Sequence, residues 1–322
     1  MKGFNPFSRI SASPTRPAAQ STSSASFDVA ALVNGPFGDP DQAVQPASVA
    51  LAEKLRQAYF WIVNHAVISP HYDVEYNLSP PQPIQFGDSQ TPLYLPTDQS
   101  YSSFILLPIL TFAARRKCLF IGGPGRGKTA SALLMGLLAG YSPKQVRRAM
   151  QHGHPQMTVA DLLGNPMPMD IMKAEEQSDI RISWRSWLDM RVKIVDEYNR
   201  IPTRTQSALL TVMGDNYAEM FNQIHECPPA AWYLTANDDQ GGGTYPVIEA
   251  LKDRIDVVVQ ALPFNPRFLD ELLIRIEEGV DPADCLPEVL QFSEADMAQM
   301  EADIRAVNLP PALRQRLEFF AS

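Results

Sequence analysis

The order of apolar and polar stretches along the middle of the chain predicts alternating strands and helices. Short apolar runs typical of strands occur at 117–121, 156–159, 192–196, 230–235 and 255–259. Between them, apolar residues recur at helical spacing, first over 129–139. Strands that alternate with helices form a mostly parallel sheet with right-handed connections. We therefore expect an α/β domain that binds its ligands at the carboxyl ends of the strands.

The segments before this alternation have a different pattern. Residues 1–47 are rich in Ser, Ala and Pro and poor in large apolar residues, which predicts a disordered tail. Residues 48–100 begin with an amphipathic helix at 48–65 and continue into a Pro-rich extension of irregular or short-strand structure. The α/β domain is expected over 101–264, with an opening helix at 101–115.

The last part of the chain has only helical patterns. Helices are predicted at 266–278, 293–306 and 310–320. The second begins with Ser293 as a cap, followed by acids in its first turn. Residues 265–322 are therefore expected to form a small helical domain beside the α/β domain.

The most informative motif lies between the first strand and its helix. Gly122, Gly127, Lys128 and Thr129 have the Gly-x-x-x-x-Gly-Lys-Thr spacing of a phosphate-binding P-loop. Glycines let the backbone curl so that N–H groups face one anion at the amino end of the helix. Lys128 can reach the β- and γ-phosphates, and the Thr129 hydroxyl can bind Mg²⁺. The predicted nucleotide-binding residues of the loop are Gly122, Gly123, Pro124, Gly125, Arg126, Gly127, Lys128, Thr129 and Ala130.

Two acids end the strand predicted at 192–196. Asp196 is predicted to bind the nucleotide's Mg²⁺ together with Thr129, as in P-loop NTPases generally. Glu197 follows directly and can polarise an attacking water, which indicates hydrolysis rather than transfer to a small molecule. Asn237 ends the strand predicted at 230–235 and can orient that water.

A basic residue precedes the last predicted strand. Arg254 ends a short predicted helix, Glu249-Ala-Leu-Lys-Asp-Arg254. In a ring of subunits this helix would face the neighbour's nucleotide, and Arg254 could act as an arginine finger on the γ-phosphate. The simpler alternative is an exposed basic helix that makes weak ion pairs.

Composition excludes several other classes of protein. Of the 322 residues, 45% are hydrophobic, as in a globular protein, and no apolar run approaches the length that spans a bilayer. The net charge of −9 argues against a broad nucleic-acid-binding face. The three cysteines have no paired spacing, which fits a reducing, cytoplasmic compartment. His152 and His154 form the one close histidine pair, interpreted as solvated loop residues rather than metal ligands.

Four stretches together resemble a MoxR-type AAA+ ATPase over roughly residues 100 to 320. They are the loop of Lys128, Val195-Asp-Glu-Tyr-Asn-Arg-Ile-Pro-Thr-Arg-Thr-Gln-Ser-Ala-Leu-Leu-Thr-Val-Met213, Thr235-Ala-Asn237 and Ala250-Leu-Lys-Asp-Arg-Ile-Asp256. The resemblance implies the AAA+ fold, ATP and Mg²⁺ as cofactors, and a hexameric ring that remodels or matures a protein substrate. It also implies a partner with a von Willebrand factor A domain.

The resemblance assigns roles to single positions. Lys128 and Thr129 correspond to Walker A, Asp196 and Glu197 to Walker B, Asn237 to sensor 1 and Arg254 to the arginine finger. The pair Asn199-Arg200 matches the family's Asn-Arg pair, for which a role between subunits is expected.

Two features depart from the family pattern. Asp238-Asp239 follows Asn237, where the family has Asn-Pro, and the Ser-Pro-Arg context of a sensor 2 arginine does not occur in the chain. The expected lid over 265–322 is therefore incomplete at its carboxyl end, or sensor 2 is replaced.

Two other functions remain open alongside a hydrolysing motor. A nucleotide-gated scaffold that assembles a partner with little ATP turnover is the main alternative, because the sequence signal for a sensor 2 arginine is weak. A P-loop kinase is disfavoured by Glu197, Asn237 and Arg254 together, and a DNA-acting motor by the acidic balance.

Overall fold

The computed structural model describes residues 46–66, 74–76, 82–84, 93–95, 99–176, 179–237, 245–264, 266, 269–277, 286–311, 314, 315 and 318. The chain divides into two units, Met1–Ala43 and Val44–Ser322, and only the second contains described residues. The tail predicted at 1–47 lies outside the described residues except for its last two positions, which begin a helix.

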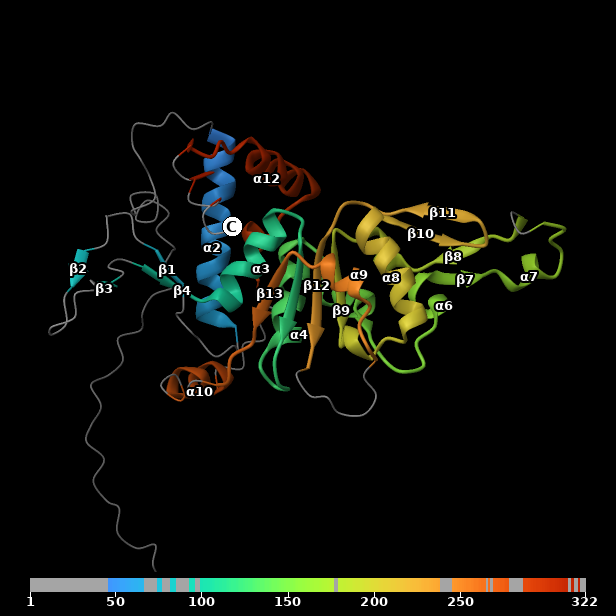
Figure 1. Ribbon diagram of the computed structural model, residues 1–322, viewed down its shortest axis with the longest axis horizontal. Helices are drawn as coiled ribbons and strands as arrows, with labels where there is room; N and C mark the ends of the chain where they lie inside the picture. Colours follow the sequence, from blue (N-terminus) through green and yellow to red (C-terminus); the bar gives the residue numbers. More distant parts are fainter. Residues whose placement is uncertain are drawn as a thin grey trace, which may run out of the picture. The chain divides into compact units, whose positions relative to one another are not determined.

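A five-stranded parallel sheet forms the centre of the second unit (Figure 1). Its strand order is β13-β5-β12-β9-β6. The strands are β5 (Lys117–Ile121), β6 (Gln151–His152), β9 (Val192–Asp196), β12 (Ala231–Ala236) and β13 (Val257–Gln260). Every pairing in this order is parallel. The predicted fold class, an α/β core with a parallel five-stranded sheet, is confirmed.

One of the five predicted strands is in the wrong place. The fifth strand is not 156–159 but β6, which pairs Gln151 with Val195 and His152 with Asp196. Thr158 instead caps α6 (Val159–Leu163) through a capping box with Asp161. Met157 is buried and supplied the apolar signal that resembled a strand. A strand of two residues is too short to produce a periodic pattern of its own.

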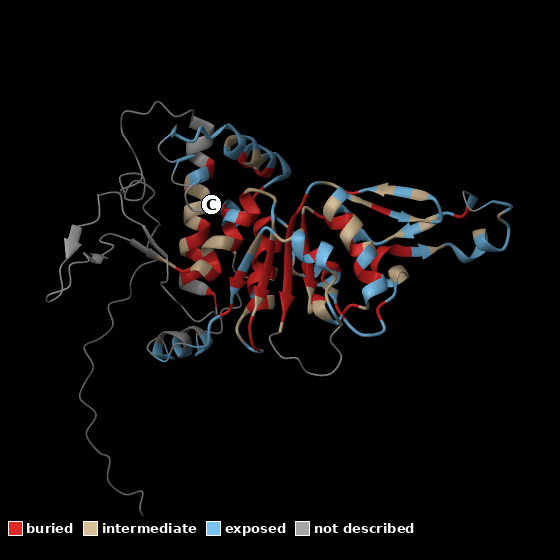
Figure 2. Cartoon of the chain, in the orientation of Figure 1, coloured by how far each residue is buried: buried red, intermediate tan, exposed pale blue. Residues whose placement is uncertain are grey.

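Helices cover the two faces of the sheet, and alternate residues of each strand point to opposite sides. Cys118 and Phe120 of β5 join one hydrophobic cluster, whereas Leu119 between them joins the other. Tyr233 and Trp232 of β12 divide in the same way. Figure 2 shows the buried residues concentrated in the sheet and the helix faces against it.

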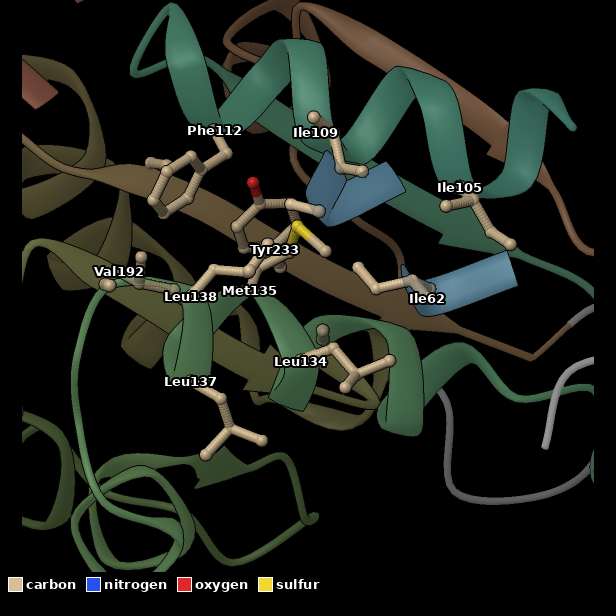
Figure 3. Packing of buried hydrophobic residues seen from close by; sticks show 14 of the residues in the cluster. Ile62, Ile105, Ile109, Phe112, Leu134, Met135, Leu137, Leu138, Val192 and Tyr233 are labelled. Carbon is tan, nitrogen blue, oxygen red and sulfur yellow. The ribbon is translucent and has the colours of Figure 1, made fainter. Parts of the chain in front are cut away.

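The first face is covered by α2 (Pro46–His65), α3 (Ser103–Ala113) and α4 (Lys128–Leu138). Figure 3 shows side chains of all three helices around Tyr233, which lies at the centre of this layer. The Tyr233 hydroxyl donates to the carbonyl of Pro108 over 2.8 Å, so the buried phenol is not left without a partner. Helices were predicted at 48–65, 101–115 and 129–139. The bounds of α2, α3 and α4 differ from these by no more than two residues at either end.

The second face is covered mainly by α6 and α8 (Thr203–Asp215). Shorter helices complete the region: α5 (Pro143–Ala149), α9 (Glu249–Asp253), η2 (Ser186–Asp189) and η3 (Tyr198–Arg200). Two small antiparallel pairs lie in the Pro-rich extension: β1 (Val74–Tyr76) with β4 (Gln99–Tyr101), and β2 (Gln82–Ile84) with β3 (Leu93–Leu95). Within the described ranges, no helix is both long and apolar enough to cross a membrane.

Two hairpins extend together from one side of the α/β core (Figure 1). One pairs β7 (Gly164–Pro166) with β8 (Ile182–Trp184), and the other pairs β10 (Tyr217–Met220) with β11 (Gln223–Glu226). Trp184 stacks on His225 between them, with ring centroids 5.1 Å apart. Beyond β7, α7 (Pro168–Ile171) carries exposed apolar side chains into solvent.

The C-terminal helices are α10 (Leu269–Glu277), η5 (Glu288–Leu290) and α12 (Glu294–Ala306). The Phe292 N–H donates to the carbonyl of Leu138, at the opposite end of α4 from the P-loop. Arg115 and Arg191 lie 3.2 and 3.4 Å from Glu294, so the first turn of α12 is bound to the core there. The lid predicted over 265–322 stays a prediction, and its residues Phe292 and Glu294 contact the core at the end of α4 opposite the P-loop. The helix predicted at 310–320 lies mostly outside the described residues.

Candidate nucleotide-binding site

The P-loop runs from the end of β5 to the start of α4. Gly122, Gly125 and Gly127 have φ angles of 151°, 72° and 79°, which side chains with a Cβ rarely adopt. At Gly122 an added Cβ would also meet the carbonyl oxygen of Ala261 at 2.7 Å, so close packing against the end of β13 excludes a side chain. The loop therefore delivers its N–H groups to the amino end of α4, where the helix dipole favours an anion.

Lys128 lies within this loop, and its side chain is buried. Its Nζ donates to the carbonyls of Gly122 and Gly123 over 2.5 and 2.7 Å, and to Asn237 Oδ1 over 2.9 Å. A buried ammonium needs such partners because burial otherwise penalises the charged form. The contact with Asn237 joins two positions that the sequence placed in one site, although 109 residues separate them.

Asp196 is the centre of a second set of contacts. Its Oδ1 accepts hydrogen bonds from Thr129 Oγ1 over 2.9 Å and from Thr235 Oγ1 over 2.6 Å. The predicted pair of magnesium ligands, Thr129 and Asp196, is therefore in direct contact. A hydroxyl and a carboxylate oxygen are the donors that Mg²⁺ prefers, so these residues fit the ion.

Glu197 follows Asp196 in a left-handed backbone conformation with φ 52° and ψ 46°. Its N–H donates to Thr235 Oγ1 over 2.9 Å. Asn237 Nδ2 donates to Glu197 Oε1, and Arg200 Nη1 donates to Glu197 Oε2, both over 2.9 Å. The predicted water-polarising acid and the predicted water-orienting amide are thus hydrogen-bonded to each other. A continuous chain of contacts runs from Lys128 through Asn237 to Glu197.

The turn after β6 packs directly against these acids. The Gly153 N–H donates to the carbonyl of Asp196 over 2.7 Å, and a Cβ on Gly153 would collide with the backbone oxygen of Glu197. His152 lies with its Nδ1 3.4 Å from Asp196 Oδ2. The interpretation of His152 as a plain loop residue is therefore incomplete, because it is exposed but belongs to the sheet beside Asp196. The described residues contain no cluster of His, Cys, Asp and Glu suited to a metal ion.

Arg254 is not part of this cluster. It ends α9 and precedes β13, whereas the P-loop follows β5, which runs parallel to β13. Arg254 and the P-loop therefore lie at opposite ends of these two neighbouring parallel strands. Arg254 Nη1 lies 3.7 Å from Asp215 Oδ1, and its side chain is 40% exposed. The sequence expectation that Arg254 acts on a neighbouring subunit fits this separation, but the role itself stays a prediction.

Two residues of the site, Thr235 and Gly153, were given no role from the sequence, and Arg200 was expected to act between subunits rather than on Glu197. Thr235 contacts both acids, Arg200 holds Glu197, and Gly153 leaves room for the Glu197 backbone. The signal for Thr235 was present, since it is a polar residue inside an otherwise apolar strand, two positions before Asn237. Gly153 could not be found without knowing that β6 pairs with β9.

Comparisons with known proteins agree with this geometry. Residues 117–257 match the family model described as ATPase family associated with various cellular activities (AAA). Among solved structures, the chain is similar to a proposed ATPase from Cytophaga hutchinsonii. That likeness has 16% identity and a TM-score of 0.52, and it covers 84% of this chain and 68% of the other. At that identity it shows the fold alone. No curated protein matches the chain in sequence. Residues 117–257 are therefore similar to an AAA-family ATPase domain, and their α/β fold around a five-stranded parallel sheet is consistent with the core of an AAA+ P-loop protein.

Proposed function

We propose that this protein hydrolyses ATP to ADP and phosphate at the site around Lys128 and Glu197. The observation that carries the proposal is the chain of hydrogen bonds from Lys128 Nζ to Asn237 Oδ1 and from Asn237 Nδ2 to Glu197 Oε1. It joins the phosphate-binding cation to a carboxylate that can accept a proton from water. A site that only bound nucleotide would not need an acid held in that position.

Each residue has a distinct part in the proposed reaction. The P-loop N–H groups and Lys128 bind the phosphates and offset the negative charge that develops on them. Glu197 accepts the proton of the attacking water, and Asn237 orients both the carboxylate and the water. Thr235 fixes the relative position of the two acids, since its one hydroxyl contacts both of them.

The residues also fit a magnesium ion bound with the nucleotide. Thr129 and Asp196 would hold it, because their oxygens already lie within 2.9 Å of each other and no nitrogen or sulfur ligand is needed. When bound, Mg²⁺ would neutralise charge on the β- and γ-phosphates.

Glu197→Gln separates hydrolysis from binding. The amide cannot accept the proton, so turnover should fall by ~10²–10⁴ while ATP affinity persists. Phosphate release and binding of a fluorescent ATP analogue should be measured on the same samples. Lys128→Ala should lose binding itself, and Lys144→Ala, an exposed lysine of α5, is the matched control. Equal turnover in wild type and Glu197→Gln would instead favour the scaffold that binds ATP with little hydrolysis.

The finer assignment follows the resemblance to MoxR-type ATPases. We propose a homo-oligomeric ring, a hexamer in the family pattern, that uses ATP to remodel or mature a protein substrate. A von Willebrand factor A domain protein is the proposed partner, and the cytoplasm the proposed location. Mass photometry with and without ATP tests the ring, and a neighbouring gene for such a domain would support the partner. A particle that stays monomeric under both conditions would exclude the ring.

A further inference from the structure

The turn after Glu197 places the guanidinium of Arg200 beside the Glu197 side chain. Tyr198, Asn199 and Arg200 form the 3-10 helix η3, and the Arg200 N–H donates to the Glu197 carbonyl over 2.9 Å. This tight turn brings Arg200 Nη1 to 2.9 Å from Glu197 Oε2. Since Asn237 donates to the other oxygen, both carboxylate oxygens of Glu197 are held.

The turn that carries Arg200 is fixed on both sides. Ile201 is fully buried beneath it, and the Tyr245 N–H donates to the carbonyl of Asn199 over 2.9 Å. Tyr198 is buried as well. The guanidinium is therefore delivered from a rigid backbone, although the Arg200 side chain itself is 44% exposed. An exposed ion pair contributes little to folding stability, so its value is the orientation that it gives to Glu197.

The geometry leaves Glu197 able to act. A carboxylate oxygen has two acceptor sites, and each oxygen of Glu197 uses one of them for the contacts to Arg200 and Asn237. The remaining sites have fixed directions because the carboxylate plane is set by two donors. With Asn237 alone, the carboxylate would be free to rotate about that single contact.

We propose that Arg200 is a positioning residue for the proposed ATP hydrolysis and acts on Glu197 of its own subunit. This inference rests on the proposed function. It differs from the role between subunits that the resemblance implies for the Asn199-Arg200 pair. The contact observed lies within one chain and joins residues three positions apart.

Arg200→Ala should lower kcat about 10- to 100-fold, by analogy with the loss of a residue that orients a metal ligand. KM and affinity for a fluorescent ATP analogue should stay within twofold of wild type, because the contact described for Arg200 is with Glu197 rather than with the P-loop. The kcat of Arg200→Lys should fall between those of wild type and Arg200→Ala, since lysine keeps the charge but loses the planar fork of donors. Arg204→Ala, an exposed arginine of α8, is the matched control and should keep wild-type turnover.

A double-mutant cycle tests whether Arg200 acts through Glu197. In a Glu197→Gln background, Arg200→Ala should change the residual turnover by less than twofold, because the group that it orients is already inactive. A full 10- to 100-fold further loss in that background would overturn the inference. A lower thermal midpoint together with weaker nucleotide binding in Arg200→Ala would likewise indicate a merely structural role.

Mixed assemblies distinguish action within one subunit from action between subunits. Arg200→Ala subunits should not regain turnover when co-assembled with Lys128→Ala subunits, because the intact Arg200 then lies in chains that cannot bind ATP. Rescue in mixtures shown to co-assemble would overturn the inference. If wild type and Glu197→Gln are equally inactive, the proposed function fails. If Glu197→Gln alone is inactive and Arg200→Ala keeps full kcat, only this inference fails.

Discussion

The hydroxyl of Thr235 donates to Asp196 Oδ1 over 2.6 Å, while its oxygen accepts the N–H of Glu197 over 2.9 Å. Thr235 is almost completely buried at the end of β12, so neither contact can be replaced by bulk water. One side chain thus sets the spacing between the proposed magnesium-binding acid and the proposed base. The central strand β12 thereby positions groups on its neighbour β9.

Thr235→Val should impair hydrolysis more than binding. The variant keeps the shape but leaves the Glu197 N–H and one Asp196 acceptor without their partner, at a cost of about 1–3 kcal/mol. We expect a lower kcat with ATP affinity largely retained, measured by phosphate release and analogue binding. Thr235→Ser keeps the hydroxyl and serves as the control. A Val variant as active as the Ser variant would contradict this account of Thr235.

Gly153→Ala should displace the backbone of Glu197, although Gly153 itself has no side chain in the site. The new methyl group would collide with the backbone oxygen of Glu197 and approach Ile201 at 3.1 Å, so the turn that carries the acid must shift. We expect reduced kcat and a lower midpoint of urea unfolding. His154→Ala, an exposed neighbour, should change neither quantity and is the control. Wild-type turnover in Gly153→Ala would show that the acid tolerates displacement of its backbone.

Most of the predicted site residues that the structure brings together lie where an apolar strand is followed directly by a polar side chain. Asp196, Glu197 and Asn237 are all of this kind, and parallel strands bring such residues to one edge. The sequence was least informative where a position depends on pairing. β6 is two residues long, and its partner β9 lies 40 residues later in the chain.

The C-terminal helices show a second limit of sequence reasoning. The helix at 293–306 was predicted within one residue, because Ser293 and the acids after it form a capping box. Its place in the fold was not predicted. That place depends on Arg115 and Arg191, which lie far from Glu294 in sequence but bind it in the structure.

The exposed methionines beyond β7 are predicted to contact a protein substrate. Met169 and Met172 are 60% and 83% exposed, whereas Trp187 of the same part of the chain is buried and donates to the Leu162 carbonyl. Flexible thioethers give adaptable apolar contact. Met169→Ser with Met172→Ser should weaken binding of fluorescein-labelled casein in the presence of ATP, measured by anisotropy, and leave basal ATPase unchanged.

The control for this surface is Val289→Ser, which removes an equally exposed apolar side chain from η5. Both sets of changes should shift unfolding by less than about 0.5 kcal/mol, because the side chains are on the surface. Casein binding that is equal in both variants would contradict a role for the methionines.

Arg254 is predicted to act on the nucleotide of a neighbouring subunit. Arginine fingers contribute ~10³–10⁵ in rate in other P-loop enzymes, so Arg254→Ala should be nearly inactive yet still bind ATP. Turnover per subunit of the wild type should rise with protein concentration. Co-assembled Arg254→Ala and Lys128→Ala subunits should regain activity, because each supplies what the other lacks. Absence of rescue in mixtures shown to co-assemble would argue against action between subunits.

Lys193 should make stability depend on pH in the alkaline range. It is buried in β9, and burial lowers its pKa from 10.5 to about 8, partly opposed by the nearby Cys227 and Asp189. Between about pH 8 and 10.5 the unfolded chain binds more protons at this residue than the folded chain, so stability rises with pH there. Across this whole pH interval the free energy of unfolding rises by about 3 kcal/mol. Below pH 8 Lys193 is charged in both states, so the folded protein carries the full cost of the buried charge.

Lys193→Met removes this titration. Urea unfolding between pH 7 and 10.5 should show a flatter dependence for the variant than for the wild type. At pH 7 the variant avoids the cost of the buried charge. It also removes the hydrogen bonds that Lys193 Nζ donates in the wild type to the carbonyls of Met190 and Pro228, over 2.8 and 3.4 Å. The pH slope is therefore the decisive quantity, rather than the stability at one pH. Lys144→Met, on the exposed face of α5, should keep the wild-type slope. Parallel curves for wild type and Lys193→Met would mean that Lys193 stays protonated across this range in the folded protein.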